Sequence, residues 1–476
     1  MKQSWTTYIS AAGLLAALLG SPAPLRAQDP GDAPPKPAAH AYPPLDTTTT
    51  DDTPSPDTLL PDSTPLTGVQ SPTLGRIESP HSYWEPGFSY SNTSQSNNPG
   101  SSNNGWSTTN YLAANVSLLE SWRAAQLAVN YSGGGEVSTD KSVGDGAFQQ
   151  LGVSQSFQWA RWQVLLLDNF SYLPTSEFGF GGGTGLGVAG GGIGGGISTG
   201  VPTTGTGGNY QTLFDAVGPR YTDNFTGQAV YLLSPRSSMN VSGTYGILRF
   251  VNPGNIDTDN SGASVGYNYQ LNKTDTIGLV YHFTHFSYVG APQTIDDHSF
   301  SFAYGKKITG KLALQVYGGP DITEFGIPIG GQSHEVSGSG GGSLLYGFSN
   351  RGSVSLGYSH SVTGGNGVSA AGQETDQVTG NISHAVGRVW RVQANVGYAR
   401  NRSIVSSAPQ TSYNTVYVGG GFSRPLGPNA NFAFAYSGNI QATAAAGCMG
   451  SACNSTYTEH QLVVTFQWHT RPLVLR

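Results

Sequence analysis

The sequence of 476 residues is poor in charge, since Lys, Arg, Asp and Glu together make up only 11% of it. Soluble domains carry about 25%. The formal net charge of −6 leaves no basic footprint for nucleic acid, so no nucleic-acid partner is expected. Ser, Thr, Asn and Gln stand at many positions where a soluble protein places Lys and Glu, which argues against ordinary globular domains.

Cysteine is also scarce. The two cysteines, Cys448 and Cys453, exclude a disulfide-dense scaffold and any zinc site built mainly from cysteine. Glycine and aromatic residues are abundant instead, with 67 Gly, 24 Tyr, 19 Phe and 8 Trp. This combination suits strands that face lipid on one side and water on the other.

Long apolar runs are missing after the first 27 residues. Residues 1–27 contain Lys2, an apolar run from Tyr8 to Leu19, and Leu25-Arg26-Ala27 as a cleavage site, which predicts a signal peptide. An uncleaved membrane helix would need about 20 apolar residues. No cysteine stands close after the run, so no lipoprotein anchor is expected. An exported chain without further helices can still span a membrane as a closed β-barrel.

Residues 28–80 are rich in Pro, Thr and Asp and contain few large apolar side chains. Such a segment cannot offset the entropy of ordering, so it is predicted to be a disordered periplasmic leader. Two interpretations stay open. The acidic leader is either a docking arm for a periplasmic protein or a passive spacer.

From about Pro86 onward, apolar and polar residues alternate with a period of two. Phe432, Phe434 and Tyr436 share one face of a predicted strand, for example, whereas Asn431 and Ser437 lie on the other. A soluble β-sandwich or a solenoid would also alternate. However, the segments run about 10–14 residues and carry aromatic residues near their ends, which favours tilted membrane strands.

The connections alternate between short and long, as in outer-membrane barrels, where the short turns are periplasmic. Long connections are predicted at, among others, 133–147, 174–224 and 323–339. The pattern predicts a transmembrane antiparallel up-and-down barrel over 81–468 with about eighteen strands, although sixteen also fit. The first strand, near Gly87 to Thr93, is the least marked. An even number places both termini in the periplasm, including a tail at 469–476.

These features resemble the porin-like bacterial outer-membrane β-barrel proteins as a class. The resemblance covers about 83–468 and rests on the signal peptide, the dyad repeats, the alternating connections and the aromatic-ended strand at 462–468. It implies the outer membrane of a Gram-negative-type bacterium, with outer-membrane lipid and the barrel-assembly machinery as partners. Many members end on an aromatic residue that this machinery reads, whereas this chain continues beyond Trp468.

Uncharged polar residues dominate the positions predicted to face the lumen, and rings of charge that would signal ion selectivity are not evident. This lining suits a small hydrophilic, neutral solute or a glycan. The predicted lumen-lining residues are Asn115, Gln126, Asn130, Asn240, Asn268, Gln315, Asn381, Arg391, Gln393 and Asn395.

The predicted long connection at 174–224, the third along the chain, is rich in glycine. It contains Gly-x-Gly-x-x-Gly, but it lacks the strand-to-helix context of a dinucleotide site. In porins of known type, the third outer loop often folds into the pore. That resemblance makes Phe178, Phe180, Phe214, Asp215 and Arg220 candidates for a pore constriction. The alternative is a flexible surface loop.

Cys448 and Cys453 belong to the last long connection, where export predicts a small local disulfide.

Catalysis is not expected, because no nucleophile elbow, phosphate loop or zinc-protease helix motif occurs. His282, His285, Asp296, Asp297 and His298 come together in one predicted hairpin. However, residues three apart on a strand point to opposite faces, so no metal site is predicted. Ser383 and His384 are residue types that could act together in catalysis. As neighbours on one strand, however, they also face opposite sides. No cofactor and no enzymatic activity are therefore expected.

Three functions are compatible with this sequence. The first is an outer-membrane channel for small hydrophilic solutes. The second is an outer-membrane exit barrel for exopolysaccharide export, with the leader contacting periplasmic partners. The third is a structural or adhesive surface barrel with a plugged lumen.

Overall fold

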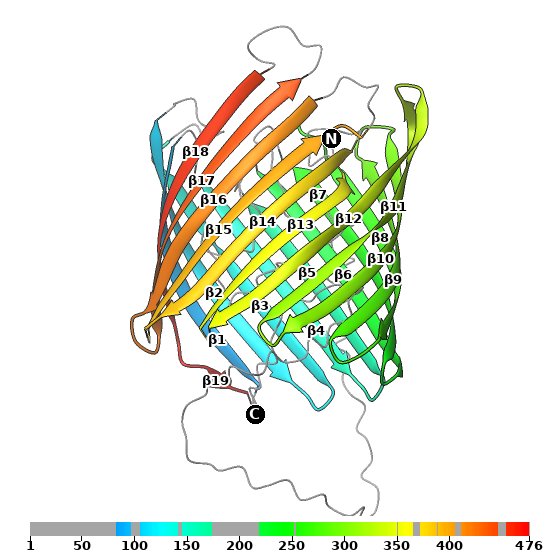
Figure 1. Cartoon of the computed structure of the whole chain (residues 1–476). Helices are drawn as coiled ribbons and strands as arrows, with labels where there is room; N and C mark the ends of the chain where they lie inside the picture. Colours follow the sequence, from blue (N-terminus) through cyan, green and yellow to red (C-terminus); the bar gives the residue numbers. More distant parts are fainter. Residues whose placement is uncertain are drawn as a thin grey trace, which may run out of the picture. The chain divides into compact units, whose positions relative to one another are not determined.

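A computed structural model describes residues 82–96, 105–140, 145–173, 219–251, 254–349, 351–364, 372–387, 389–404, 411–445 and 454–475. Strands account for most of this part of the chain (Figure 1). Within these ranges, no helix is long and apolar enough to cross a membrane.

Eighteen long strands form one antiparallel sheet that closes on itself, and each strand pairs with the next along the chain. They are β1 (Tyr83–Ser96), β2 (Trp106–Ser121), β3 (Ala125–Ser138), β4 (Gly146–Gln158), β5 (Trp162–Leu173), β6 (Arg220–Ser234), β7 (Ser237–Phe250), β8 (Thr258–Gln270), β9 (Asp275–Tyr288), β10 (Thr294–Thr309), β11 (Leu312–Ile329), β12 (Gln332–Ser349), β13 (Gly352–Thr363), β14 (Gln373–Val386), β15 (Trp390–Arg402), β16 (Thr411–Pro425), β17 (Ala430–Ala445) and β18 (Asn454–His469).

The barrel closes between its first and last long strands. β1 pairs with β18 from Gly87 opposite His469 to Gln95 opposite Gln461. A two-residue strand, β19 (Leu473–Val474), continues this seam by pairing with Tyr83 and Trp84. The two described ends of the barrel chain therefore meet at the same end of the barrel.

The predicted barrel of eighteen strands is confirmed, and the alternative of sixteen is wrong. The first strand, predicted near Gly87 to Thr93, extends from Tyr83 to Ser96. We call the end of the barrel with the turns after β2, β4 and the other even-numbered strands the short-turn end. The opposite end, after the odd-numbered strands, is the long-connection end.

The predicted long connection at 323–339 is wrong. β11 and β12 instead continue to a two-residue turn formed by Gly330 and Gly331. Their φ angles are 60° and 85°, as a type I′ turn requires, and this turn matches the twist of the flanking strands. The glycines and Pro328 near the tip hid the alternation in the sequence.

The predicted connection at 133–147 is too long at its start, because Gly133, Gly134 and Gly135 belong to β3. They pair with β2, and Gly134 lies opposite Ala113. A Cβ built on Gly134 would lie 1.9 Å from the carbonyl oxygen of Leu112. Glycine here permits close backbone contact rather than marking a loop.

The outward face of the sheet is a belt of exposed apolar side chains. Trp162, Trp390 and Trp468, each 37–46% exposed, lie near the short-turn end. Tyr221 and Tyr245, which are 44% and 49% exposed, lie towards the long-connection end. A soluble protein does not expose such a surface, whereas an apolar band between two aromatic girdles is typical of a lipid-facing barrel.

Candidate functional site: the lumen

Contacts across the barrel identify the inward face. Gly364 follows β13, and a Cβ built on it would lie 2.7 Å from the ring of Phe286 on β9. Three strands separate β9 from β13 in the sheet, so this contact runs through the interior. Phe286 lies opposite Asn260 and Ile295, and the strict alternation then assigns inward positions on every strand.

Short polar side chains line the inward face and form hydrogen bonds between neighbouring strands. The Ser132 hydroxyl donates to Asn115 Oδ1 at 2.7 Å, and Asn115 Nδ2 donates to Ser89 Oγ at 3.1 Å. Asn268 Nδ2 donates to Asn240 Oδ1 at 3.2 Å on the other side of the barrel. These lateral bonds hold the amides in fixed orientations along the wall.

The structure places all ten predicted lumen-lining residues at inward positions. Asn115, Asn240 and Asn268 are buried, Asn381 and Arg391 are exposed, and the others are partly exposed. The strand register supports this placement, since residues directly opposite each other face the same side. Asn395 lies opposite Asn381, for example, and Gln315 lies opposite Ser343.

Sequence reasoning missed several carboxylates at inward positions. Within the described strands these include Glu136 on β3, Asp297 on β10, Asp321 on β11, Glu335 on β12 and Glu459 on β18. They do not form a ring, because three of them occupy the adjacent strands β10 to β12. Counting odd and even positions from Ser299 and Ser301 would have assigned Asp297 to the lumen.

The acidic patch on β10 and β11 is hydrogen-bonded. The Thr323 hydroxyl donates to Asp297 Oδ1 at 2.9 Å, and both side chains are buried. Asp321 lies opposite Ser299, one inward position further from the long-connection end. Lys307, Arg391 and the carboxylate Glu85 all occupy inward positions near the short-turn end.

Of the five constriction candidates, only Arg220 lies within the described residues. It starts β6 at the long-connection end, opposite Leu173 and Phe250, and is buried. Phe178, Phe180, Phe214 and Asp215 lie outside the described residues, as do Cys448 and Cys453.

An apolar cluster that the sequence did not predict lies at the long-connection end. It joins Phe286, Tyr288, Ile295, Phe325, Val362 and Ile404, all 8% exposed or less. A Cβ built on Gly372 would lie 2.7 Å from Ile295 and 2.9 Å from Ile404. The two ends of the β13–β14 connection therefore pack inward against β9 and β10.

The residues considered for metal binding fall on two faces. His282 faces the lumen, where its Nε2 lies 2.8 Å from the Thr284 hydroxyl. His285 faces outward and pairs with Asp296 Oδ1 at 2.6 Å. The described residues contain no group of three His, Cys, Asp or Glu side chains placed to hold a metal ion. Ser383 likewise faces inward and His384 outward, against Phe348.

The fold and the lumen together define a closed antiparallel barrel with an apolar exterior and a polar interior. No protein-family model matches the sequence, and no curated protein matches it. Solved structures that the chain resembles include OccK5 (OpdH) of Pseudomonas aeruginosa, at 7% identity and a TM-score of 0.40, covering 82% of this chain and 98% of that chain.

The outer membrane protein OpdK of Pseudomonas aeruginosa matches at 10% identity and a TM-score of 0.41, with 81% of this chain and 99% of that chain covered. OccAB3 of Acinetobacter baumannii matches at 10% identity and a TM-score of 0.38, with the same coverages. The architecture assigned to this chain follows from its own strand pairing.

Proposed function

We propose that this chain is an outer-membrane channel of a Gram-negative-type bacterium and that small hydrophilic solutes cross through its lumen. The observation that supports this proposal is the opposite polarity of the two faces of one closed sheet. Val392, for example, is 41% exposed on the outward face, whereas its neighbour Gln393 lies inward.

Closure makes the membrane location physically reasonable. In lipid, every backbone N–H and C=O must find a partner within the protein, and a closed barrel meets this requirement without a free edge. Barrels with 16–18 strands usually leave an aqueous channel. By the same rule of loop lengths, the short-turn end faces the periplasm and the long-connection end faces outside.

Uncharged solutes fit the wall best. Serine, threonine, asparagine and glutamine offer both donors and acceptors to hydroxyl groups of a solute such as a sugar. The carboxylates on β10 to β12 stand near the outer end of the proposed path, so anions should enter less readily than neutral solutes of equal size. Of these carboxylates, Glu335 is partly exposed, whereas Asp297 and Asp321 are buried.

Planar-bilayer conductance of the purified barrel, combined with swelling of liposomes in neutral and anionic solutes, tests the proposal. We expect discrete channel openings, and faster swelling with small neutral sugars than with anions of similar size. A folded barrel that gives neither conductance nor swelling would contradict the channel and favour an adhesive or structural barrel.

A further inference from the structure

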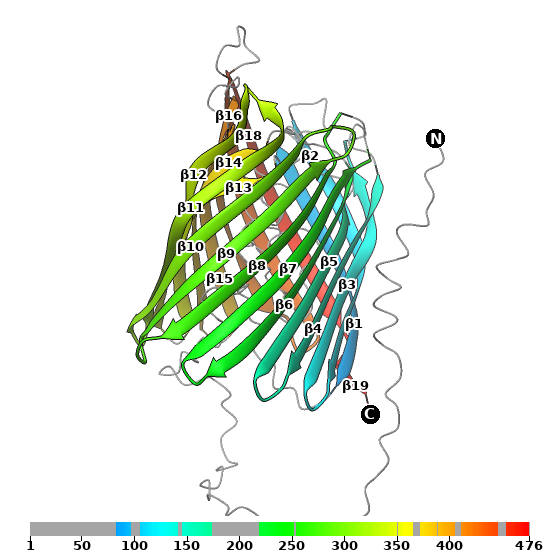
Figure 2. The same cartoon turned by 90° about the vertical axis from the view of Figure 1, so that its right-hand side faces the viewer.

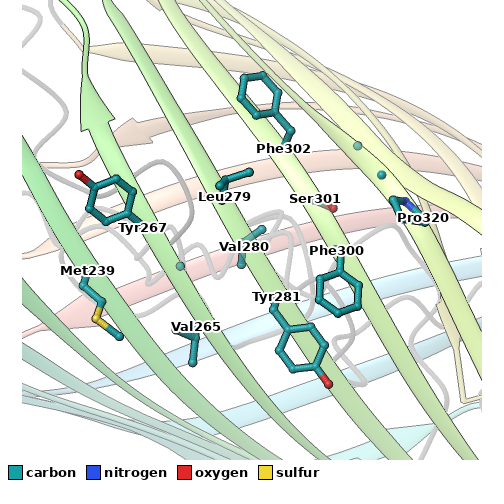
Figure 3. A pocket seen from close by; sticks show the side chains of 13 residues that line it. Met239, Val265, Tyr267, Leu279, Val280, Tyr281, Phe300, Ser301, Phe302 and Pro320 are labelled. Atoms are coloured by element: carbon teal, nitrogen blue, oxygen red, sulfur yellow. The ribbon is translucent and has the colours of Figure 1, made fainter.

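The outward face of the barrel carries an apolar groove of about 540 Å³ over strands β7 to β11. Figure 2 shows these strands side by side, and Figure 3 shows the groove at close range, with Leu279, Phe300, Phe302 and Pro320 among its labelled side chains. Leu279, Phe300 and Phe302 are 51–62% exposed, so the groove opens away from the lumen.

The groove exists because large and minimal side chains stand next to each other. Phe302 on β10 lies opposite Gly318 on β11, and Gly318 in turn lies opposite Gly340 on β12. Pro320 lies opposite Gly338, another position without a large side chain. The phenylalanine side chains of β10 therefore form one wall of the groove, and backbone atoms form much of its floor.

The groove lies in the middle of the strands, within the apolar belt. Leu279 and Tyr281 occupy the central part of β9, and Phe300 and Phe302 the central part of β10. A water-soluble partner would have to pass the aromatic girdle to reach them. The occupant must therefore come from the membrane phase.

One end of the groove is polar. The Tyr281 hydroxyl, at the edge of the groove, lies 2.8 Å from Nδ1 of His298. The next outward pair towards the long-connection end is His285 with Asp296, at 2.6 Å. An apolar channel that ends in hydroxyl, imidazole and carboxylate groups matches a molecule with a hydrocarbon chain and a polar end.

We propose that one acyl chain of a membrane lipid occupies this groove, with the polar part of the lipid at the Tyr281–His298 end. An acyl chain is narrow and flexible enough to fill a groove that would otherwise lack contacts on one side, and unfilled apolar surface loses packing energy. A second copy of this chain is the other candidate occupant of this face, and the oligomeric state measured below distinguishes the two.

Native mass spectrometry of the barrel released from nanodiscs of bromine-labelled phosphatidylethanolamine tests the proposal. Gly318→Leu fills the groove, since a Cβ there has no neighbour closer than 3.4 Å. Gly420→Leu is the matched control, because Gly420 lies outward on β16, opposite Ala394 and Tyr436, and a Cβ there has no neighbour closer than 3.7 Å.

We expect the wild type and Gly420→Leu to retain one bromine-labelled lipid. Gly318→Leu should reduce the lipid-bound fraction about tenfold, because the buried methylene contacts are lost. Phe302→Ala removes part of the wall without adding volume and should also reduce it, which covers the case in which Gly318→Leu does not fold.

Equal lipid retention in all of these variants would overturn the proposal. So would a wild-type oligomer without lipid that Gly318→Leu dissociates, because the groove would then be an interface between copies. Conductance should be the same in the wild type and in these variants whether or not lipid is retained, since Gly318 and Phe302 lie on the outward face.

Discussion

At the scale of single residues, adjacent positions on one strand of this barrel face opposite environments. Gln393 faces the lumen on β15, and Val392, one residue earlier, faces outward. Placing the same large side chain at each of these two positions therefore separates an effect on the permeation path from a general effect on the barrel.

We predict that Gln393→Trp lowers single-channel conductance, by on the order of 10% or more, because the indole occupies part of the pore cross-section. Val392→Trp, the matched control, should leave conductance unchanged. Planar-bilayer recording checks both. An equal decrease in both variants would indicate a general defect of the barrel and contradict the assignment of inward and outward faces.

A second prediction concerns the glycine run in β3. Gly134→Ala should destabilise the barrel by about 1–3 kcal/mol, because the added methyl group overlaps the Leu112 carbonyl oxygen. Gly135→Ala should have little effect, since a Cβ there has no neighbour closer than 3.7 Å. Urea titration of the purified variants measures both, and equal midpoints would show that the β2–β3 backbone adapts to the methyl group.

At the scale of elements, the apolar cluster at the long-connection end brings β9, β10 and β11 into contact with residues of β13 and of the segment after β15, which are not their neighbours in the sheet. Ile295 at the start of β10 is fully buried and belongs to the same cluster as Ile404, which follows β15. The sequence could not reveal this cluster, because its members come from five different strands or connections. Its members meet where the described ends of the β13–β14 connection, Gly364 and Gly372, pack against Phe286 and Ile295.

Ile295→Ala should lower the free energy of unfolding by about 2–5 kcal/mol, since the site cannot collapse fully around the missing carbons. It should also raise the protease sensitivity of the β13–β14 connection, whose Gly372 packs on Ile295. Val336→Ala, at an outward position that is 63% exposed, is the control and should change stability by less than about 1 kcal/mol. An unchanged digestion pattern for Ile295→Ala would show that the cluster does not hold this connection.

Strand positions were largely predictable from the sequence, because one face must be apolar and the other polar in every strand of a two-sided sheet. Alternation fails where glycine replaces side chains, as at Gly133 to Gly135, and where a tight turn joins two long strands, as at Gly330 and Gly331. The inward carboxylates were missed for another reason. Composition averages over both faces, so Asp321 and Glu459 stand out only when the odd and even positions of each strand are counted separately.

At the scale of the whole molecule, the seam between β1 and β18 carries the closure of the barrel. Nine residue pairs join these two strands, whereas β19 contributes two pairs. The segment after His469 therefore adds little to the closed structure.

We predict that removal of residues 470–476 leaves a folded barrel that still migrates anomalously on a gel without heating, with a loss of stability of at most about 1–2 kcal/mol. Trp468→Ser is the contrasting variant, because it removes the stacking on Phe88, whose ring centroid lies 5.5 Å from that of Trp468. A shortened chain that fails to fold would show that the two β19 pairs are needed for closure.

The seam also joins the two parts of the described chain that are furthest apart in sequence. Ser91 donates a hydrogen bond to the carbonyl of Val464, a partner 373 residues later in the chain. Until β18 is available, one edge of β1 has unpaired backbone groups, and pairing across such a separation in sequence is slow. Closure of the seam is therefore expected to be the last step of folding, and the edges of β1 and β18 stay open to other strands until then.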